Sequence, residues 1–435
     1  MHSFAPQIVL ITILSLVILS DALASKLKIP SVFLLLIGSY LVYTYIPAAI
    51  PIDMKLYFDT IILFCIPLIF MGDALHLHFA DLKKYGWDIF YLAVVAVALS
   101  ITIGTSMYYF DVFEGLTLGA YVSLFAINMA TDAVSVQSIL SRFKGINHHI
   151  KVLIEGESLG NDATAVIAFF FIGLPWMLSG QIDPMQATLN ALRVFVVSIG
   201  IGLAIGFVFY MLMKLFSDKR GEFFAFVVEA YLAYVIAEEM HVSGILTLIT
   251  AIIATHAWID LDIKAAEEAE PKKAKTFMCK IRFEDIQATT SERLEYIYEM
   301  AKEFGYIAAV MIFFVLAEMV NFDKLWEYRV EIFIMFGITT LIRAISMAKF
   351  AVIGSKIKKI APIGKEGWFI LTFSGMKGAL SIILVHMIPD SYVHKDFFEA
   401  VTIGVVVLSI FVYGITLWTY FTFFKKEKKR SIFKS

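Results

Sequence analysis

Apolar runs long enough to cross a bilayer recur along nearly the whole chain and restrict its fold more than any other feature. The hydrocarbon core is about 30 Å thick, so a spanning helix needs about 20 mostly apolar residues. Because a segment inside lipid must satisfy its own backbone hydrogen bonds, these runs predict an all-α polytopic membrane protein with about 13 transmembrane helices. The predicted spans are 7–24, 30–48, 57–75, 88–110, 115–140, 149–178, 188–214, 222–238, 242–258, 304–321, 330–352, 366–388 and 396–424.

Composition excludes the soluble classes. Hydrophobic residues make up 60% of the chain and charged residues 17%, against about 45–50% and 25% in soluble domains. The two cysteines, Cys65 and Cys279, lie far from any Cys/His group, so no disulfide framework or zinc site is expected. We expect no enzyme activity, no cofactor and no nucleic-acid partner.

Basic residues are distributed unevenly between the predicted loops. When the loops are assigned alternately to two sides, most of the 36 Lys and Arg fall on one side. The positive-inside rule then predicts an external N-terminus and a cytoplasmic C-terminus. Residues 1–424 are predicted to form one transmembrane unit, residues 259–303 a cytoplasmic loop with an amphipathic segment, and residues 425–435 a basic cytoplasmic tail at anionic lipid.

An acidic and polar octet lies inside the sixth span, from Glu155 to Asp162. Acidic groups near the bilayer centre cost about 2.5–3.5 kcal/mol each on insertion scales, so a chain that keeps them usually uses them. At about 100° per residue, Glu155, Ser158 and Asp162 share one helix face, whereas Glu157 points away and Asn161 lies at the edge. We interpret the stripe as a cation or proton site; a buried polar contact between packed helices is the alternative.

Two other spans carry polar interruptions. The fifth contains Thr131 and Asp132, and the twelfth contains Lys377 between two glycines. Each pattern predicts a locally unwound helix, with Lys377 compensating charge near the half-helix ends. Paired interrupted spans are typical of inverted-repeat transporters with a site at the midplane; a kinked but continuous helix is the alternative for the fifth span.

Arg343 lies alone in the apolar eleventh span and needs a carboxylate partner there. Glu155 is the preferred candidate because it lies on the Asp162 stripe, and Glu157 is the second choice. A structural Glu155–Arg343 ion pair would leave Asp162 to titrate.

The octet and the Thr131-Asp132 break together resemble the monovalent cation:proton antiporter-1 family, of the prokaryotic NhaP type. Supporting segments are Leu27–Gly38, Glu239–Leu246 and Gly375–Ser381. The resemblance implies an inverted-repeat fold with two discontinuous crossing helices, spans 5 and 12. It also implies a homodimer in a prokaryotic inner membrane, with a dimerisation domain and a six-helix transport domain that includes parts of residues 88–178 and 304–424.

The same resemblance implies that Na⁺, or Li⁺ or K⁺, exchanges for H⁺ by alternating access. Asp162 would bind the ion with help from Ser158, Asp132 and the Thr131 carbonyl. Asn161 would be the neutral neighbour, standing where electrogenic relatives carry a second Asp, which predicts electroneutral 1:1 exchange.

Two residues depart from the family pattern: Ala133 follows Thr131-Asp132 where Pro is common, and Lys377 stands where Arg is usual. The rival functions are a cation channel, an intramembrane protease and, among transporters, an organic-anion carrier or a K⁺-selective cation/proton antiporter. The sequence leaves the choice of cation open.

Overall fold

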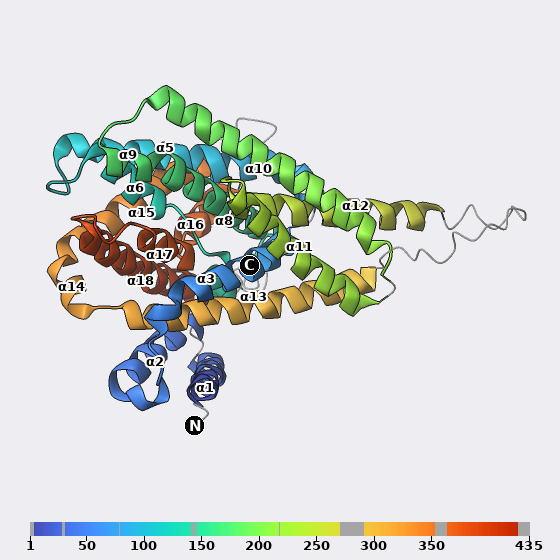
Figure 1. Cartoon of the computed structure of the whole chain (residues 1–435), viewed down its shortest axis with the longest axis horizontal. Coiled ribbons are helices and arrows are strands. Elements are labelled where there is room, and N and C mark those ends of the chain that lie inside the picture. The colour runs from blue at the N-terminus through green and yellow to red at the C-terminus, as the bar shows by residue number, and fades with distance from the viewer. Residues whose placement is uncertain are drawn as a thin grey trace, which may run out of the picture. The chain divides into compact units, whose positions relative to one another are not determined.

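The structure is a computed structural model that describes residues 4–27, 31–77, 79–140, 143, 146–216, 218–269, 291–352 and 363–424. Within these ranges every regular element is helical, as the apolar runs predict (Figure 1). The longer helices are α1 (Ala5–Leu27), α2 (Ser31–Tyr45), α3 (Phe58–His76), α4 (Phe79–Phe90), α5 (Ala96–Thr105), α6 (Leu118–Ile127), α7 (Ala133–Leu140), α8 (His148–Ala168), α10 (Pro184–Met213), α11 (Lys219–Glu239), α12 (Gly244–Ala269), α13 (Ser291–Met319), α15 (Arg329–Val352), α16 (Gly364–Phe373), α17 (Ala379–His386) and α18 (Lys395–Thr419). The short elements are η1 (Pro47–Ala49), η2 (Met54–Tyr57), η3 (Tyr91–Val95), η4 (Ser106–Phe110), η5 (Phe169–Gly173), α9 (Leu174–Ser179), α14 (Phe322–Glu327) and η7 (Tyr420–Phe424).

Each predicted span coincides with a helix or with an interrupted helix. Nine helical segments of the described chain are long and apolar enough to cross a membrane. The other four predicted spans correspond to α2, to α11, to the pair α6 and α7, and to the pair α16 and α17. The two pairs are the discontinuous helices expected in spans 5 and 12.

The expected loop at 259–303 needs a correction at both ends. Helix α12 continues to Ala269, and α13 begins at Ser291 and runs without a break into the tenth span. Charged residues end an apolar run but not a helix, because a helix can extend beyond the hydrocarbon core. Residues 270–290, and the expected basic tail at 425–435, lie outside the described residues.

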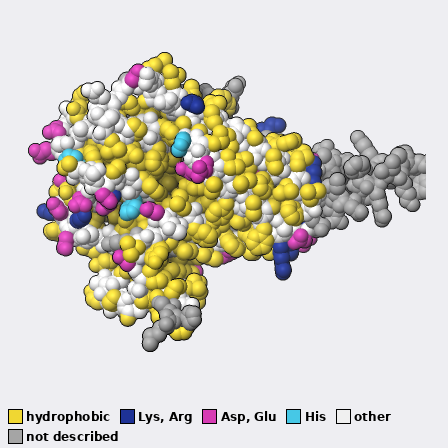
Figure 2. All heavy atoms as spheres, in the orientation of Figure 1, with side chains coloured by type: hydrophobic (Ala, Val, Ile, Leu, Met, Phe, Trp, Pro, Cys, Tyr) yellow, Lys and Arg dark blue, Asp and Glu magenta, His cyan; other side chains and the backbone are white. Residues whose placement is uncertain are grey.

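The chain divides into two compact units. The first comprises Met1–Ile62, Trp87–Thr188 and Ala309–Ser435, and it contains both interrupted helices and α8. The second comprises Leu63–Gly86 and Leu189–Ala308, in which α11 packs along α12. The face shown in Figure 2 is largely hydrophobic, which fits a surface in contact with lipid.

Two glycines let α8 pack closely against the fourth span. A Cβ at Gly156 would lie 2.7 Å from Ile89, and one at Gly160 would lie 2.4 Å from Ala93. Small residues four apart are a common device for close helix contact in membranes, where apolar burial gives little driving force. This packing fixes α8 with its polar residues directed at the interrupted helices.

Candidate functional site

The two interrupted helices meet at their breaks. The Asp132 backbone N–H, at the end of the first break, donates to the Met376 carbonyl in the second at 2.8 Å. A Cβ at Gly378 would lie only 2.5 Å from the Asp132 Cβ, so a side chain there would force the breaks apart. The structure therefore brings together two segments that lie about 245 residues apart in the chain.

Ser158 of α8 holds the first break open. Its hydroxyl donates to the Thr131 carbonyl at 2.7 Å and accepts from the Ala133 backbone N–H at 3.0 Å. These are the backbone groups that an interrupted helix leaves without partners in the helix itself. The Ser158 hydroxyl supplies both missing partners, and its bond with Ala133 uses a backbone N–H that a Pro at this position would lack.

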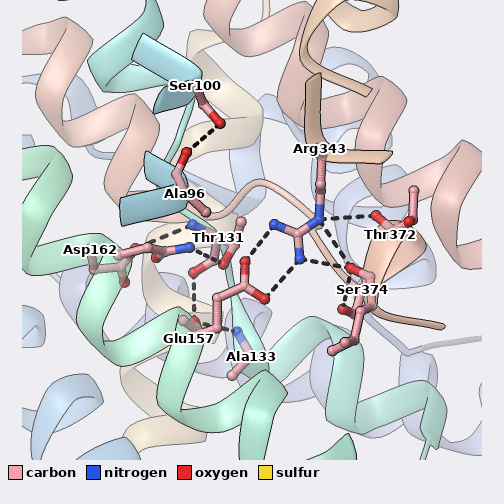
Figure 3. Close-up of polar contacts among 12 residues, drawn as sticks. Ala96, Ser100, Thr131, Ala133, Glu157, Asp162, Arg343, Thr372 and Ser374 are labelled. Atoms are coloured by element: carbon pink, nitrogen blue, oxygen red, sulfur yellow. Dashed lines mark hydrogen bonds and ion pairs between the residues drawn. The ribbon is translucent and has the colours of Figure 1, made fainter. Parts of the chain in front are cut away.

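Asp162 contacts the same break from the next turn of α8 (Figure 3), and so does Asn161. The Thr131 backbone N–H donates to Asp162 Oδ1 at 3.2 Å. The Asn161 amide donates to the Thr131 hydroxyl at 2.7 Å. All three side chains are buried, with Asp162 7% exposed. The predicted cluster of Thr131, Ser158, Asn161 and Asp162 is thus one contiguous site.

The Asp132 carboxylate caps the next half-helix. Its Oδ2 accepts from the Ser135 backbone N–H at 3.3 Å and also from the Ser135 hydroxyl. This is the geometry of an N-cap at the start of α7, where a negative charge is stabilised by the helix dipole. Asp132 thus has a structural task in addition to its expected part in ion binding, which stays a prediction.

The predicted Glu155–Arg343 ion pair is wrong, because Arg343 pairs with Glu157. The guanidinium binds both carboxylate oxygens, NH1 to Oε1 at 2.5 Å and NH2 to Oε2 at 2.9 Å (Figure 3). Helix periodicity correctly directs Glu157 away from Asp162, but that side of α8 is not without contacts. In the structure α8 is buried on both sides, and α15 approaches the second side with Arg343.

Arg343 also closes the end of α16. Its Nε and NH2 donate to the Leu371 carbonyl at 3.1 and 2.8 Å, and its Nε to the Thr372 carbonyl at 3.0 Å. These carbonyls lie in the last turn, where a cation is favoured by the dipole. A Cβ at Gly375 would lie 2.2 Å from Arg343 Nε, so this glycine leaves room for the guanidinium.

Lys377 lies in the second break, as expected. Its backbone N–H donates to the Ser409 hydroxyl of α18 at 2.8 Å, and its side chain is 3% exposed. Its expected role, charge compensation near the half-helix ends, stays a prediction.

Glu155 takes a different place from the one expected. Its Oε1 accepts from the Gln137 side-chain amide of α7 at 3.1 Å, and the carboxylate is half-buried. Sequence reasoning also missed Ser409 and gave Gln137 no role. Neither contact could be predicted from the sequence, because a lone polar residue in an apolar run does not indicate its partner on another helix.

Asp162, Ser158 and Thr131 bring carboxylate, hydroxyl and backbone carbonyl oxygens together at the first break. Hard monovalent cations are bound by such oxygen donors in transporters, where unwound backbone supplies the carbonyls. A carboxylate can alternatively take a proton. The fold and the site together define a membrane transporter of cations built on crossed, interrupted helices.

Comparison with known proteins gives the particular family. The family model of the transmembrane sodium/hydrogen exchangers matches residues 10–422, and the chain belongs to this family. The chain is 28% identical to the Na(+)/H(+) antiporter ApNhaP of Aphanothece halophytica, with 82% of this chain and 63% of ApNhaP covered. It is 26% identical to the Na(+)/H(+) antiporter NhaH of Halobacillus dabanensis, with 96% of both chains covered.

A solved structure shares the fold. The sodium proton antiporter MjNhaP1 of Methanocaldococcus jannaschii superposes with a TM-score of 0.74 over 96% of both chains, at 16% identity. The likeness extends over nearly the whole chain. The all-α antiporter fold predicted from the sequence is therefore confirmed.

Proposed function

We propose that this protein exchanges Na⁺ for H⁺ across a membrane by competition of the two ions for Asp162. The observation that carries the proposal is the buried Asp162 carboxylate, held against the unwound backbone at Thr131 beside the Ser158 hydroxyl. The named activity of ApNhaP and NhaH agrees with it. Li⁺ and K⁺ are the alternative cations.

The exchange follows from one carboxylate and two ligands. Ionised Asp162 binds the cation with oxygens of Ser158, Thr131 and Asp132. Protonated Asp162 is neutral and releases the cation. A transport domain that crosses the membrane only when Asp162 holds one of the two ions then couples their movements. Glu157 stays paired with Arg343.

The remaining features of the proposal concern the whole protein. We infer a homodimer in a prokaryotic cell membrane, with the N-terminus outside and the C-terminus in the cytoplasm. Residues 88–178 and 304–424 contribute to the transport domain, and membrane lipid surrounds the rest. The uneven distribution of basic residues supports the orientation. The long apolar helices support the membrane location.

Asp162→Asn in proteoliposomes tests the proposal. The variant keeps the hydrogen-bonding shape but cannot exchange a proton for a cation, so dissipation of a pH gradient by Na⁺ is expected to fall to background. Li⁺ and K⁺, supplied in turn, identify the transported ions. Asp111→Asn, the same change at an exposed turn, serves as the matched control and is expected to retain full activity. Exchange by a folded Asp162→Asn protein would remove Asp162 from its role.

A further inference from the structure

The second interrupted helix holds the beginning of the first break. Helix α6 ends at Ile127, and the Ser381 hydroxyl of α17 donates to the Ile127 carbonyl at 2.8 Å. Carbonyls in the last turn of a helix have no partner within that helix, so a side chain from another element can satisfy them. Both residues are fully buried. The bond therefore fixes the point at which α6 gives way to the break.

The same interrupted helix holds the other end of the first break. The Asp132 backbone N–H donates to the Met376 carbonyl at 2.8 Å. Met376 lies in the second break, and Ser381 follows it by five residues on α17. Ile127 and Asp132 are likewise five residues apart in the first interrupted helix. The first break is thus held at both ends by one segment of the other interrupted helix.

Thr131 lies between these two end contacts and carries the backbone groups of the ion site. Residues 128–132 belong to no regular helix, so contacts with other elements determine where their backbone lies. The Thr131 carbonyl accepts from Ser158, and its N–H donates to Asp162 Oδ1. The place of the Thr131 carbonyl relative to the Asp162 carboxylate therefore depends on both end contacts.

We propose that Ser381 is a positioning residue of the ion site, which acts through the Ile127 carbonyl on the place of Thr131. The proposal rests on the proposed exchange function. Oxygens that bind a ligand must be held within about 0.5 Å of their productive positions, and supporting contacts do this. The contact between Asp132 and Met376 joins two backbone groups. Ser381 supplies its end contact with a side chain, so a single substitution can remove it.

Ser381→Ala in membrane vesicles tests the positioning role. The apparent KM for Na⁺ is expected to rise about three- to tenfold, which is the net stabilisation by one hydrogen bond expressed as affinity. The maximal rate is expected to stay within a factor of about two, because Asp162 still exchanges the two ions. Ser381→Cys, which keeps a weak donor of similar size, is expected to give an intermediate KM.

Thermal unfolding in detergent measures cation binding separately from transport. A cation that binds the folded protein raises the unfolding temperature. Ser381→Ala is expected to need about three- to tenfold more Na⁺ for the same rise. Ser100→Ala is the matched control, because Ser100 is also buried but its hydroxyl binds the Ala96 carbonyl of its own helix, α5. This variant is expected to keep the wild-type KM.

An unchanged KM in a folded Ser381→Ala protein, or a loss of maximal rate alone, would overturn the positioning role. An equal rise of KM in Ser100→Ala would overturn it too. Should Ser381→Ala fail to fold, Ser381→Cys decides by the same KM criterion. A wild-type protein that binds Na⁺ in the unfolding assay but does not exchange it would instead overturn the proposed function. The binding measurement would then still decide the role of Ser381.

Discussion

Arg343 serves two parts of the first unit at once. Its guanidinium forms a forked pair with Glu157 and also binds two carbonyls at the end of α16. Both side chains of the pair are largely buried, at 11% and 4% exposed. Removing one member of a buried pair leaves the other charge buried without a partner. This costs more free energy than the intact pair contributes to stability.

Arg343→Ala and Glu157→Ala are each expected to lower the free energy of unfolding by about 3–5 kcal/mol. The double variant should lose less free energy of unfolding than the two single variants added together, because both changes remove the same interaction. Thermal unfolding in detergent measures these losses. The double variant with Glu155→Ala and Arg343→Ala is the control. The effects of these two changes on the free energy of unfolding should be additive. Coupling to Glu155 in place of Glu157 would contradict the observed pairing.

At the scale of the elements, the site depends on two half-helix pairs that cross at their breaks. The hydrogen bond from the Asp132 N–H to the Met376 carbonyl joins the breaks directly. Asp132 at the start of α7 and Arg343 at the end of α16 place opposite charges at opposite helix poles. Close approach at Gly378 is what permits this arrangement.

Gly378→Ala is therefore expected to disturb the crossing. The new methyl group would lie 2.5 Å from the Asp132 Cβ, a contact that forces backbone movement. Overpacking of this kind costs about 1–3 kcal/mol, and cation affinity should fall with it. Gly337→Ala on α15 is the control, since nothing lies within 4 Å of a Cβ there. Normal stability and affinity in Gly378→Ala would show that the breaks have more room than the structure indicates.

At the scale of the whole molecule, the number of charged groups at the ion site determines whether one exchange cycle moves net charge across the membrane. Asn161 donates an amide hydrogen to the Thr131 hydroxyl beside Asp162. An amide at this position contributes no second titrating group. One proton exchanged for one monovalent cation moves no net charge.

Exchange is accordingly expected to be independent of membrane potential. The dependence on potential can be measured in proteoliposomes, in which a potassium gradient with valinomycin sets the membrane potential. The readout is the pH change driven by Na⁺. The initial rate and the final pH gradient should be the same at zero and at imposed potential. A rate or endpoint that follows the potential would contradict one-for-one exchange. Asn161→Asp offers a comparison, because a second carboxylate could make transport potential-sensitive.

Much of the fold and part of the site could be predicted from the sequence. Length and hydropathy determine the helices, since each span must satisfy its own backbone in lipid. Polar interruptions at Thr131-Asp132 and at Lys377 located both breaks, because their residue types and glycines disfavour a continuous helix. The stripe at Ser158 and Asp162 followed from helix periodicity alone. These are local properties, and local sequence specifies them.

The partner of each buried charge was decided by the tertiary structure. Helix periodicity showed that Glu155 and Glu157 lie on different faces of α8, but it could not show which face α15 would approach with Arg343. The tasks of Gln137 and Ser409 likewise depend on contacts between different helices. In this protein the sequence by itself determined the helices, the breaks and the polar stripe of α8. The packing of helices against one another decided which carboxylate pairs with Arg343, because ion pairing depends on distance in space.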